Sequence, residues 1–152
     1  MIVDSAVYRK GERVAVACSP HDYATLRSET YDPGDFVWVG LHQPTHSELD
    51  KVADAFGLHH LAVEDAVKAH QRPKLERYDD HLFLILKTLW YVEDEDAVET
   101  GEISMFVGSD FVISVRHGEG GALQSARQHL EQRAKVLTHG PSAVVYAVCD
   151  SV

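Results

Sequence analysis

One long apolar run constrains the fold more than any other feature of this sequence. Residues 81–92 read HLFLILKTLWYV, and apolar side chains fill both sets of alternate positions along most of the run. Successive side chains of a β-strand point to opposite faces, so such a strand has to be covered on both sides. The run therefore predicts a central strand of a sheet that lies between helices.

Shorter runs predict the rest of the sheet. The β-prone segments are residues 2–8, 14–18, 35–40, 102–107 and 111–117. The turn Lys10-Gly11-Glu12 joins the first two segments, and Gly108-Ser109-Asp110 joins the last two, so each pair is predicted to form a hairpin. With helices between the other strands, the expected sheet is mixed.

Two helices are predicted in the first half of the chain. Thr45 and Glu48 form a capping box, and Gly57 supplies a C-terminal stop. Between them, apolar residues recur at helical spacing: Leu49, Val52, Ala53 and Phe56. A second helix is expected from residue 60 to residue 69, because Pro73 favours extended backbone at the residue before it.

The last thirty residues predict two more helices. One has a single apolar stripe made of Leu123, Ala126, Leu130, Ala134 and Leu137. Opposite that stripe, Arg127, Glu131 and Lys135 are spaced as an i, i+4 ladder facing solvent. Pro141 suits the first turn of a final helix over residues 142–152, which has no capping residue at its end. We expect that helix to continue in a longer protein.

Composition narrows the class of protein. The 152 residues fit one α/β domain, and a net charge of -10 argues against nucleic acid as a partner. That charge favours cations as ligands, or else serves only solubility. Cys18 and Cys149 are the only cysteines, which suits a reducing cytoplasm. No apolar run reaches the roughly 18 residues of a membrane span, so this part of the protein is expected to be soluble.

Several motifs that could indicate chemistry are weak. The ten histidines include the pair His42 and His46 and the pair His59 and His60, but no cysteine pair or His-Glu-x-x-His pattern accompanies them. The loop at residues 118–121 is glycine-rich, yet it lacks the lysine of a phosphate-binding loop and is interpreted as a turn. No nucleophile elbow is present, and nothing indicates an enzyme.

The segment after residue 60 is more informative. At helical spacing Ala62, Val63 and Ala66 share one face, while Glu64 and Asp65 lie on the other. Two adjacent carboxylates on a polar face can bind a divalent cation. The alternative is an ordinary solvated face with an i, i+4 ion pair from Glu64 to the lysine at position 68, worth about 0.2 to 0.5 kcal/mol.

Four motifs together resemble the N-terminal domain of the CorA family of magnesium and cobalt transporters. They are Phe56-Gly57-Leu58-His59, Val63-Glu64-Asp65, His70-Gln71-Arg72-Pro73-Lys74 and Leu84-Ile85-Leu86-Lys87. The resemblance runs from about residue 36 to residue 152. It implies a mixed sheet between helical layers, over residues 1–152, and a homopentamer whose domains form a funnel at the cytoplasmic face of the membrane. The membrane segments would follow the last helix.

The resemblance also implies candidate metal ligands. In this family divalent cations bind weakly between neighbouring domains and hold the pore closed, which makes the domain a regulatory module and not an enzyme. The matching ligands are Glu64, Asp65 and, in the Tyr146-x-x-x-Asp motif, Asp150. The ion would be Mg²⁺, with Co²⁺ or Zn²⁺ as alternatives. A ligand from the stalk helix and the Gly-Met-Asn pore signature have no counterpart within these residues.

Two other hypotheses remain open. In a zinc-transporting relative, the metal chemistry would shift toward histidines such as His59, His60 or His70. The chain could instead be a free-standing α/β enzyme or small-molecule-binding protein, for which the sequence offers only polar residues at strand ends.

Overall fold

The computed structural model describes residues 1–68, 71–95, 97–118 and 123–151. Within these ranges one sheet has the strand order β2-β1-β3-β7-β6-β5-β4. Its strands are β1 (Ile2–Arg9), β2 (Glu12–Val14), β3 (Phe36–His42), β4 (Lys74–Arg77), β5 (His81–Val92), β6 (Ala97–Gly108) and β7 (Phe111–His117). Strands β3 and β7 are parallel and the other pairs are antiparallel. The predicted mixed sheet is confirmed.

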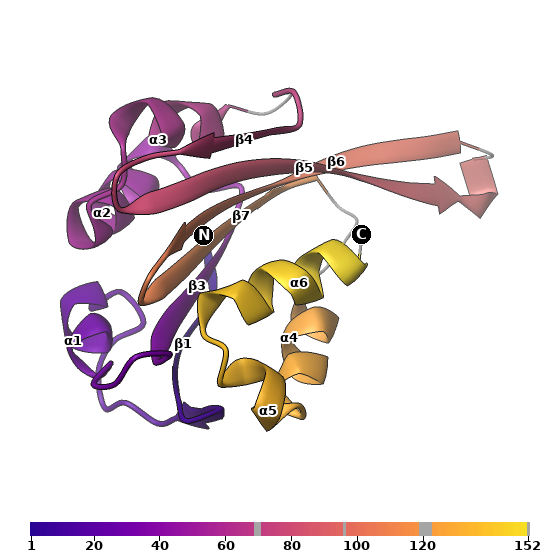
Figure 1. Cartoon of the computed structure of the whole chain (residues 1–152). Helices are drawn as coiled ribbons and strands as arrows, with labels where there is room; N and C mark the ends of the chain where they lie inside the picture. The colour runs from indigo at the N-terminus through magenta and orange to yellow at the C-terminus, as the bar shows by residue number, and fades with distance from the viewer. Residues whose placement is uncertain (69–70, 96, 119–122, 152) are drawn as a thin grey trace.

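Helices cover both faces of the sheet (Figure 1). On one face lie α1 (Tyr23–Ser28), α2 (His46–Phe56) and α3 (His60–Val67). On the other lie α4 (Gln124–Glu131), α5 (Ala134–Leu137) and α6 (Pro141–Ser151). A short 3-10 helix, η1 (Glu93–Glu95), joins β5 to β6. The prediction of an α/β sandwich is therefore also confirmed. Across the described ranges, no helix has the length and hydropathy needed to cross a membrane.

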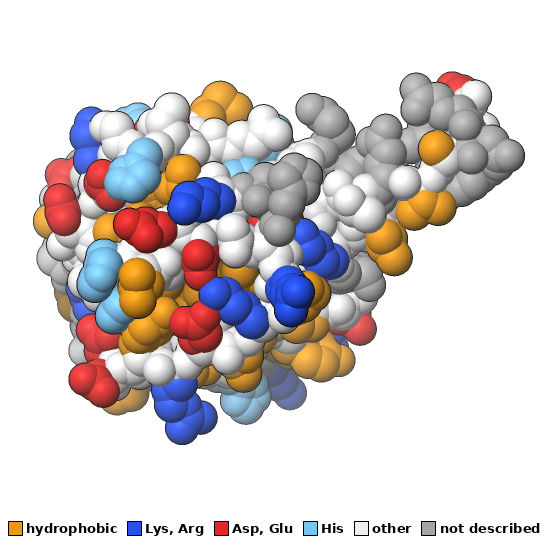
Figure 2. Space-filling view, turned by 90° about the horizontal axis from the view of Figure 1, so that it is seen from above, with side chains coloured by type: hydrophobic (Ala, Val, Ile, Leu, Met, Phe, Trp, Pro, Cys, Tyr) orange, Lys and Arg blue, Asp and Glu red, His pale blue; other side chains and the backbone are white. Residues whose placement is uncertain are grey.

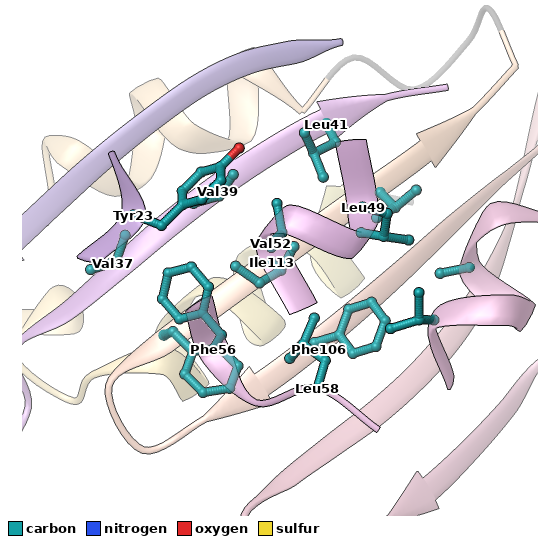
Figure 3. Packing of buried hydrophobic residues seen from close by; sticks show 14 of the residues in the cluster. Tyr23, Val37, Val39, Leu41, Leu49, Val52, Phe56, Leu58, Phe106 and Ile113 are labelled. Atoms are coloured by element: carbon teal, nitrogen blue, oxygen red, sulfur yellow. The ribbon is translucent and has the colours of Figure 1, made fainter. Parts of the chain in front are cut away.

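The alternation of side chains along the strands produces two separate cores. Val37, Val39 and Ile113 point toward α2 and α3, where they meet Leu49 and Phe56 (Figure 3). The intervening residues of the same strands point the other way: Phe36, Trp38 and Val112 pack with Leu130 and Val144 of the second helical layer. Each large apolar side chain buried in this way contributes about 1.5 to 3 kcal/mol, so both layers are held by apolar burial.

The caps of α2 form as predicted. The Thr45 hydroxyl accepts a hydrogen bond from the Glu48 amide, and the Glu48 carboxylate accepts one from the Thr45 amide, both at 3.1 Å. Gly57 ends the helix in the left-handed conformation, with φ at 68°. These caps fix both ends of the helix that precedes α3.

Strand β5 is not central, contrary to the prediction. It lies second from the edge, because β4 pairs with its first half. The four residues of β4 are mostly charged, and their sequence gives no strand signal. Beyond Lys87 and Glu102 neither β4 nor β7 accompanies the pair, so β5 and β6 continue as a two-stranded arm (Figure 1). Of the acidic segment 93–96 at its end, Asp96 lies outside the described residues.

The first hairpin is shorter than predicted. Strand β2 ends at Val14, and the chain then turns, with the Cys18 amide donating to the Val16 carbonyl at 3.0 Å. Val16 and Cys18 pack against the first core from this turn. Their β-prone character therefore reflects burial and not strand pairing. Helix α1, which follows, was not predicted from its short and polar sequence.

The predicted helix over residues 123–137 is broken. Helix α4 ends at Glu131, and Arg133 has non-helical backbone (φ -118°, ψ 69°) before α5 begins. The expected solvent-facing ladder is also wrong, because Arg127 is buried with its guanidinium 3.8 Å from the Trp38 ring. The break brings α5 against the β1–β2 turn, where a Cβ on Gly11 would lie only 2.4 Å from the Ala134 carbonyl oxygen. Helix α6 begins at Pro141 as predicted.

Candidate metal site

Helix α3 carries two of the three predicted ligands. Ala62, Val63 and Ala66 are buried against the first core, as the helical spacing predicts. That leaves Glu64 exposed and Asp65 partly buried at the edge of the helix. The helix ends at Val67, earlier than predicted, because Lys68 already has extended backbone. Residues 69 and 70 lie outside the described residues.

Asp65 is held by a lysine from the neighbouring edge strand. Lys74, at the start of β4, donates hydrogen bonds to the carboxylates of Asp65 and Glu76, and the bond to Glu76 is 2.6 Å long. The Tyr78 hydroxyl donates to the same Glu76 at 2.6 Å. Asp65 is therefore already paired with an ammonium group, whereas Glu64 has no ion pair among the described residues.

These contacts shift the proton affinities of the cluster. The hydrogen bond from Lys74, followed by that from Tyr78, lowers the pKa of Glu76. Burial and the bond to Glu76 raise the pKa of the Tyr78 hydroxyl to about 12. The bonds to Asp65 and Glu76 raise the pKa of Lys74. The Lys74 ammonium group is thus shared between the carboxylates of Asp65 and Glu76, and the Tyr78 hydroxyl keeps its proton at neutral pH.

The surface over this cluster is mixed in charge. Figure 2 looks down on the side of the molecule that carries α3 and β4, and shows acidic, basic and histidine side chains interspersed there. The ion pair from Glu64 to Lys68, which the alternative interpretation of this helix face required, is not among the salt bridges of the described residues. Glu64 therefore remains available to a cation or to a neighbouring molecule.

A second polar group lies beneath the C-terminal end of α3. Glu102 on β6 is 3% exposed, and one of its oxygens accepts hydrogen bonds from Lys87 Nζ at 2.7 Å and from the Gln71 amide at 2.8 Å. His117 on β7 donates from Nε2 to the Ala66 carbonyl at 2.7 Å. These residues anchor α3 and the segment after it to the sheet. Sequence reasoning missed Glu102, because a charged residue at the start of a predicted strand gives no sign of burial.

Asp150 lies in the other helical layer. It is exposed on α6 and lines a groove of about 470 Å³ together with His129, Arg133 and Tyr146. The sheet separates this groove from α3 (Figure 1). Within one molecule the structure therefore brings Glu64 and Asp65 together and leaves Asp150 apart from them.

The histidines of the zinc hypothesis form a stack of rings. His60, His59, Tyr78 and His81 follow one another with ring centroids 4.7, 4.3 and 5.1 Å apart. His59 Nδ1 accepts from the Leu61 amide, and His81 Nε2 accepts from the His59 amide. His70 lies outside the described residues. No group of three or more metal-binding side chains occurs in the part of the chain that the structure describes.

Comparisons with known proteins place the domain in one class. The fold resembles the full-length CmaX protein, with a TM-score of 0.70 and 18% identity over 98% of this chain and 44% of that one. It also resembles the ZntB cytoplasmic domain from Vibrio parahaemolyticus, with a TM-score of 0.65 and 15% identity over 99% and 57% of the two chains. The domain thus shares its fold with parts of both proteins.

Sequence comparison defines the family. Residues 33–152 match the model of the CorA-like Mg²⁺ transporter protein family, and the chain belongs to that family. It is 30% identical to the putative metal ion transporter YfjQ of Bacillus subtilis over 77% of this chain and 35% of that protein. It is 24% identical to the cobalt/magnesium transport protein CorA of Thermotoga maritima, over 76% and 34%. The chain spans about a third of the length of these two relatives.

Proposed function

We propose that this chain is the cytoplasmic, regulatory domain of a divalent-cation transporter, which senses Mg²⁺ through Glu64, Asp65 and Asp150. The ions bind between neighbouring copies of the domain in a ring of five and favour the closed state of the pore. The domain has no catalytic activity of its own. The membrane segments and the stalk belong to the remainder of the protein.

The separation of the acidic residues carries this proposal. Glu64 and Asp65 lie on one helical layer and Asp150 on the other, with the sheet between them. One molecule therefore cannot present all three carboxylates to one ion. A ring of identical subunits uses heterologous interfaces, in which one face of each copy meets the opposite face of the next. Such an interface can bring Asp150 of one copy toward Glu64 of another.

The local chemistry supports a weak site. Mg²⁺ keeps several of its waters and is usually held by one or two carboxylates, which suits an exchangeable ion. An ion at Asp65 also competes with the ammonium group of Lys74, which weakens binding further. At an ion concentration equal to Kd each site contributes RT ln 2, about 0.4 kcal/mol, so five interfaces contribute about 2 kcal/mol toward the closed state.

A zinc-transporting relative is the second candidate, favoured by the fold shared with the ZntB domain and by the stacked histidines. His59 Nδ1 accepts from the Leu61 amide, so Nε2 carries the proton of the neutral ring, and zinc binding at Nε2 would break that hydrogen bond. Titration of the chain with Zn²⁺ and with Mg²⁺, followed by the imidazole resonances of His59 and His60, separates the two. Zinc-specific shifts of these rings would favour the second candidate.

The test of the first candidate is transport by the full-length protein at varied internal Mg²⁺. The double variant E64Q/D65N should raise the half-inhibitory Mg²⁺ concentration at least threefold. Without these carboxylates Mg²⁺ loses its preference for the closed state, and an ion without such a preference does not shift the equilibrium between open and closed pores. Asp54→Asn is the matched control, since it removes an exposed carboxylate from the same helical layer. An inhibition curve that is unchanged in the double variant, or equally shifted in the control, would contradict the proposal.

A further inference from the structure

The connections of the two parallel strands create a crevice in the sheet. Strand β3 leads to α2 on one face, whereas its parallel neighbour β7 leads to α4 on the opposite face (Figure 1). Where neighbouring parallel strands send their connections to opposite faces, a crevice opens at their carboxyl ends, and α/β proteins bind ligands there. The candidate metal ligands on α3 and α6 lie elsewhere, so this crevice has no part in the function proposed above.

A pocket of about 270 Å³ occupies this position. Its floor is one row of the sheet in which Asp4, Gly40 and Ser114 are paired across β1, β3 and β7. Gly40 is the centre of the row, in the interior of a strand, and its backbone does not require glycine. A Cβ added there would make only ordinary contacts, at 3.5 Å from Arg127 Nη2 and 3.6 Å from Ser114 Oγ. Glycine inside a strand often marks the close approach of a ligand, and here it keeps the pocket open.

The walls of the pocket present hydrogen-bond donors. Arg127 is 6% exposed. Among the described residues its guanidinium group contacts the Tyr8 hydroxyl through Nη1 and Asp4 through Nε. The third nitrogen, Nη2, faces the space above Gly40. Arg116 and Gln124 also line the pocket. The Ser114 hydroxyl accepts from the Trp38 indole at 3.1 Å and keeps its own proton to donate. Arginine forks of this kind match carboxylate and phosphate geometry.

Arginine side chains gather around the pocket, although the chain as a whole carries -10. Arg13 and Arg127 share the single carboxylate of Asp4, and Arg13 also binds Glu131. Arg116, which also donates to the Gly118 carbonyl at 3.3 Å, adds a guanidinium group to the lining. In addition, α4 begins at the pocket, and the side chain at its N-cap, Leu123, cannot accept from the first amides of the helix.

We propose that this pocket binds a small anion, a phosphate or a carboxylate, between the guanidinium groups of Arg116 and Arg127 and above Gly40. The Ser114 hydroxyl and the Gln124 amide complete its shell of donors. The volume admits an inorganic anion or the acidic end of a small metabolite. The anion would join β1, β3, β7 and α4, and so add an input that is separate from the divalent cation.

The test is titration of the isotopically labelled 152-residue chain with inorganic phosphate and, separately, with acetate, at constant ionic strength set by chloride. Saturable shifts of the Trp38 indole N–H and of the Gly40, Ser114 and Gln124 amides are expected, with a Kd of about 1 mM or tighter. Saturation by phosphate alone identifies a phosphate site, and saturation by acetate a carboxylate site. If neither anion gives saturable shifts at these four groups, the proposal is wrong.

Two variants and a control locate the site. Gly40→Ala places a methyl group in the pocket without a clash, and Arg116→Gln removes one guanidinium; each should weaken binding about tenfold or more. Arg133→Gln makes the same charge change at an exposed position in the same helical layer and should change affinity less than twofold. Equal effects of Arg116→Gln and Arg133→Gln would reduce the binding to general electrostatics and overturn the proposal. Retained chemical shifts elsewhere in the spectrum of the Gly40→Ala variant confirm that its fold is intact.

Discussion

The molecule contains two ionic clusters, one on each side of the sheet, and they are built for different tasks. On the α3 side, Lys74 joins Asp65 to Glu76, and neither carboxylate is more than nine positions from Lys74 in the chain. On the α4 side, Arg13 and Arg127 join Asp4 of β1 to Glu131 and to the Tyr8 hydroxyl, across more than 110 residues.

The difference in connectivity separates a structural cluster from an exchangeable one. The α4-side cluster ties the N-terminal strands to α4, and its central guanidinium is packed on Trp38. The α3-side cluster only fastens a helix to a four-residue edge strand, and both partners of its central ion pair are about 30% exposed. If the proposed function is correct, a divalent cation replaces the ammonium group of Lys74 there, and we expect the domain to stay folded.

The largest effect should come from Arg127→Ala. The substitution removes the buried guanidinium that contacts Trp38, the Tyr8 hydroxyl and Asp4, and leaves Glu131 and Arg13 as the remaining partners of the last two. It should lower the free energy of unfolding by about 2 to 4 kcal/mol. Urea denaturation measures this loss. Arg133→Ala, an exposed arginine between α4 and α5, should change stability by less than about 0.5 kcal/mol. Similar losses in the two variants would erase the distinction between the clusters.

The second largest difference between the two clusters should appear in how the stability of the fold depends on acidic pH. Burial opposes ionisation of Asp4, but the bonds and charges of Arg13 and Arg127 outweigh it and lower its pKa below 3.8. Since the folded pKa lies below the unfolded one, Asp4 stabilises the fold above about pH 4, and this stabilisation is lost as the pH falls through the folded pKa. Asp4→Asn should therefore flatten the decline in stability between pH 5 and pH 3.

Glu76 provides the comparison for that experiment. The bonds from Lys74 and Tyr78 lower its pKa as well, so its contribution has the same sign. Its cluster is more open to solvent, which screens the interaction. Glu76→Gln should flatten the acid decline less than Asp4→Asn does. The opposite ranking in urea denaturation from pH 3 to pH 7 would show that the α3-side cluster is the more structural one.

The smallest effect on stability should come from Lys74→Met. Loss of this half-exposed ion pair should change the free energy of unfolding by less than about 1 kcal/mol. Release of Asp65 from the ammonium group bonded to it should tighten Mg²⁺ binding to the chain about fivefold, equivalent to about 1 kcal/mol. Lys68→Met, an exposed lysine without a bond to Asp65, should tighten it less. Magnesium titration followed at the Glu64 and Asp65 amides measures the affinity of both variants. Equal increases in affinity would show that Lys74 acts only through its overall charge and does not compete with the ion for Asp65.

Periodicity and capping predicted much of the fold. The capping box of α2, the apolar face of α3 and the hairpin of β6 and β7 all follow from local spacing, and the structure confirms them. Local patterns could not reveal β4, because an edge strand of charged residues is stabilised by its partner β5. They also misplaced Arg127, whose spacing is that of a solvent-facing ladder, because its partners lie more than 100 residues away in the chain.

The candidate site was only partly predictable for the same reason. Sequence alone placed Glu64 and Asp65 on the polar side of a helix, and the structure agrees for Glu64. The bond from Lys74 to Asp65 joins β4 to α3, and the bond from the Gln71 amide to the buried Glu102 joins the segment after α3 to β6. Such contacts between separate elements have no signature in local spacing.

A double-mutant cycle on the full-length protein tests most directly whether acids from opposite layers meet at one ion. Glu64→Gln and Asp150→Asn suit it, because both residues are exposed and neither has an ion pair among the described residues. Each single variant should raise the internal Mg²⁺ concentration that half-inhibits transport at least threefold. The double variant should raise this concentration no further than the larger single effect does, because either single substitution already removes the same bound ion. Independent effects that multiply in the double variant would place the two carboxylates at separate sites and contradict the account.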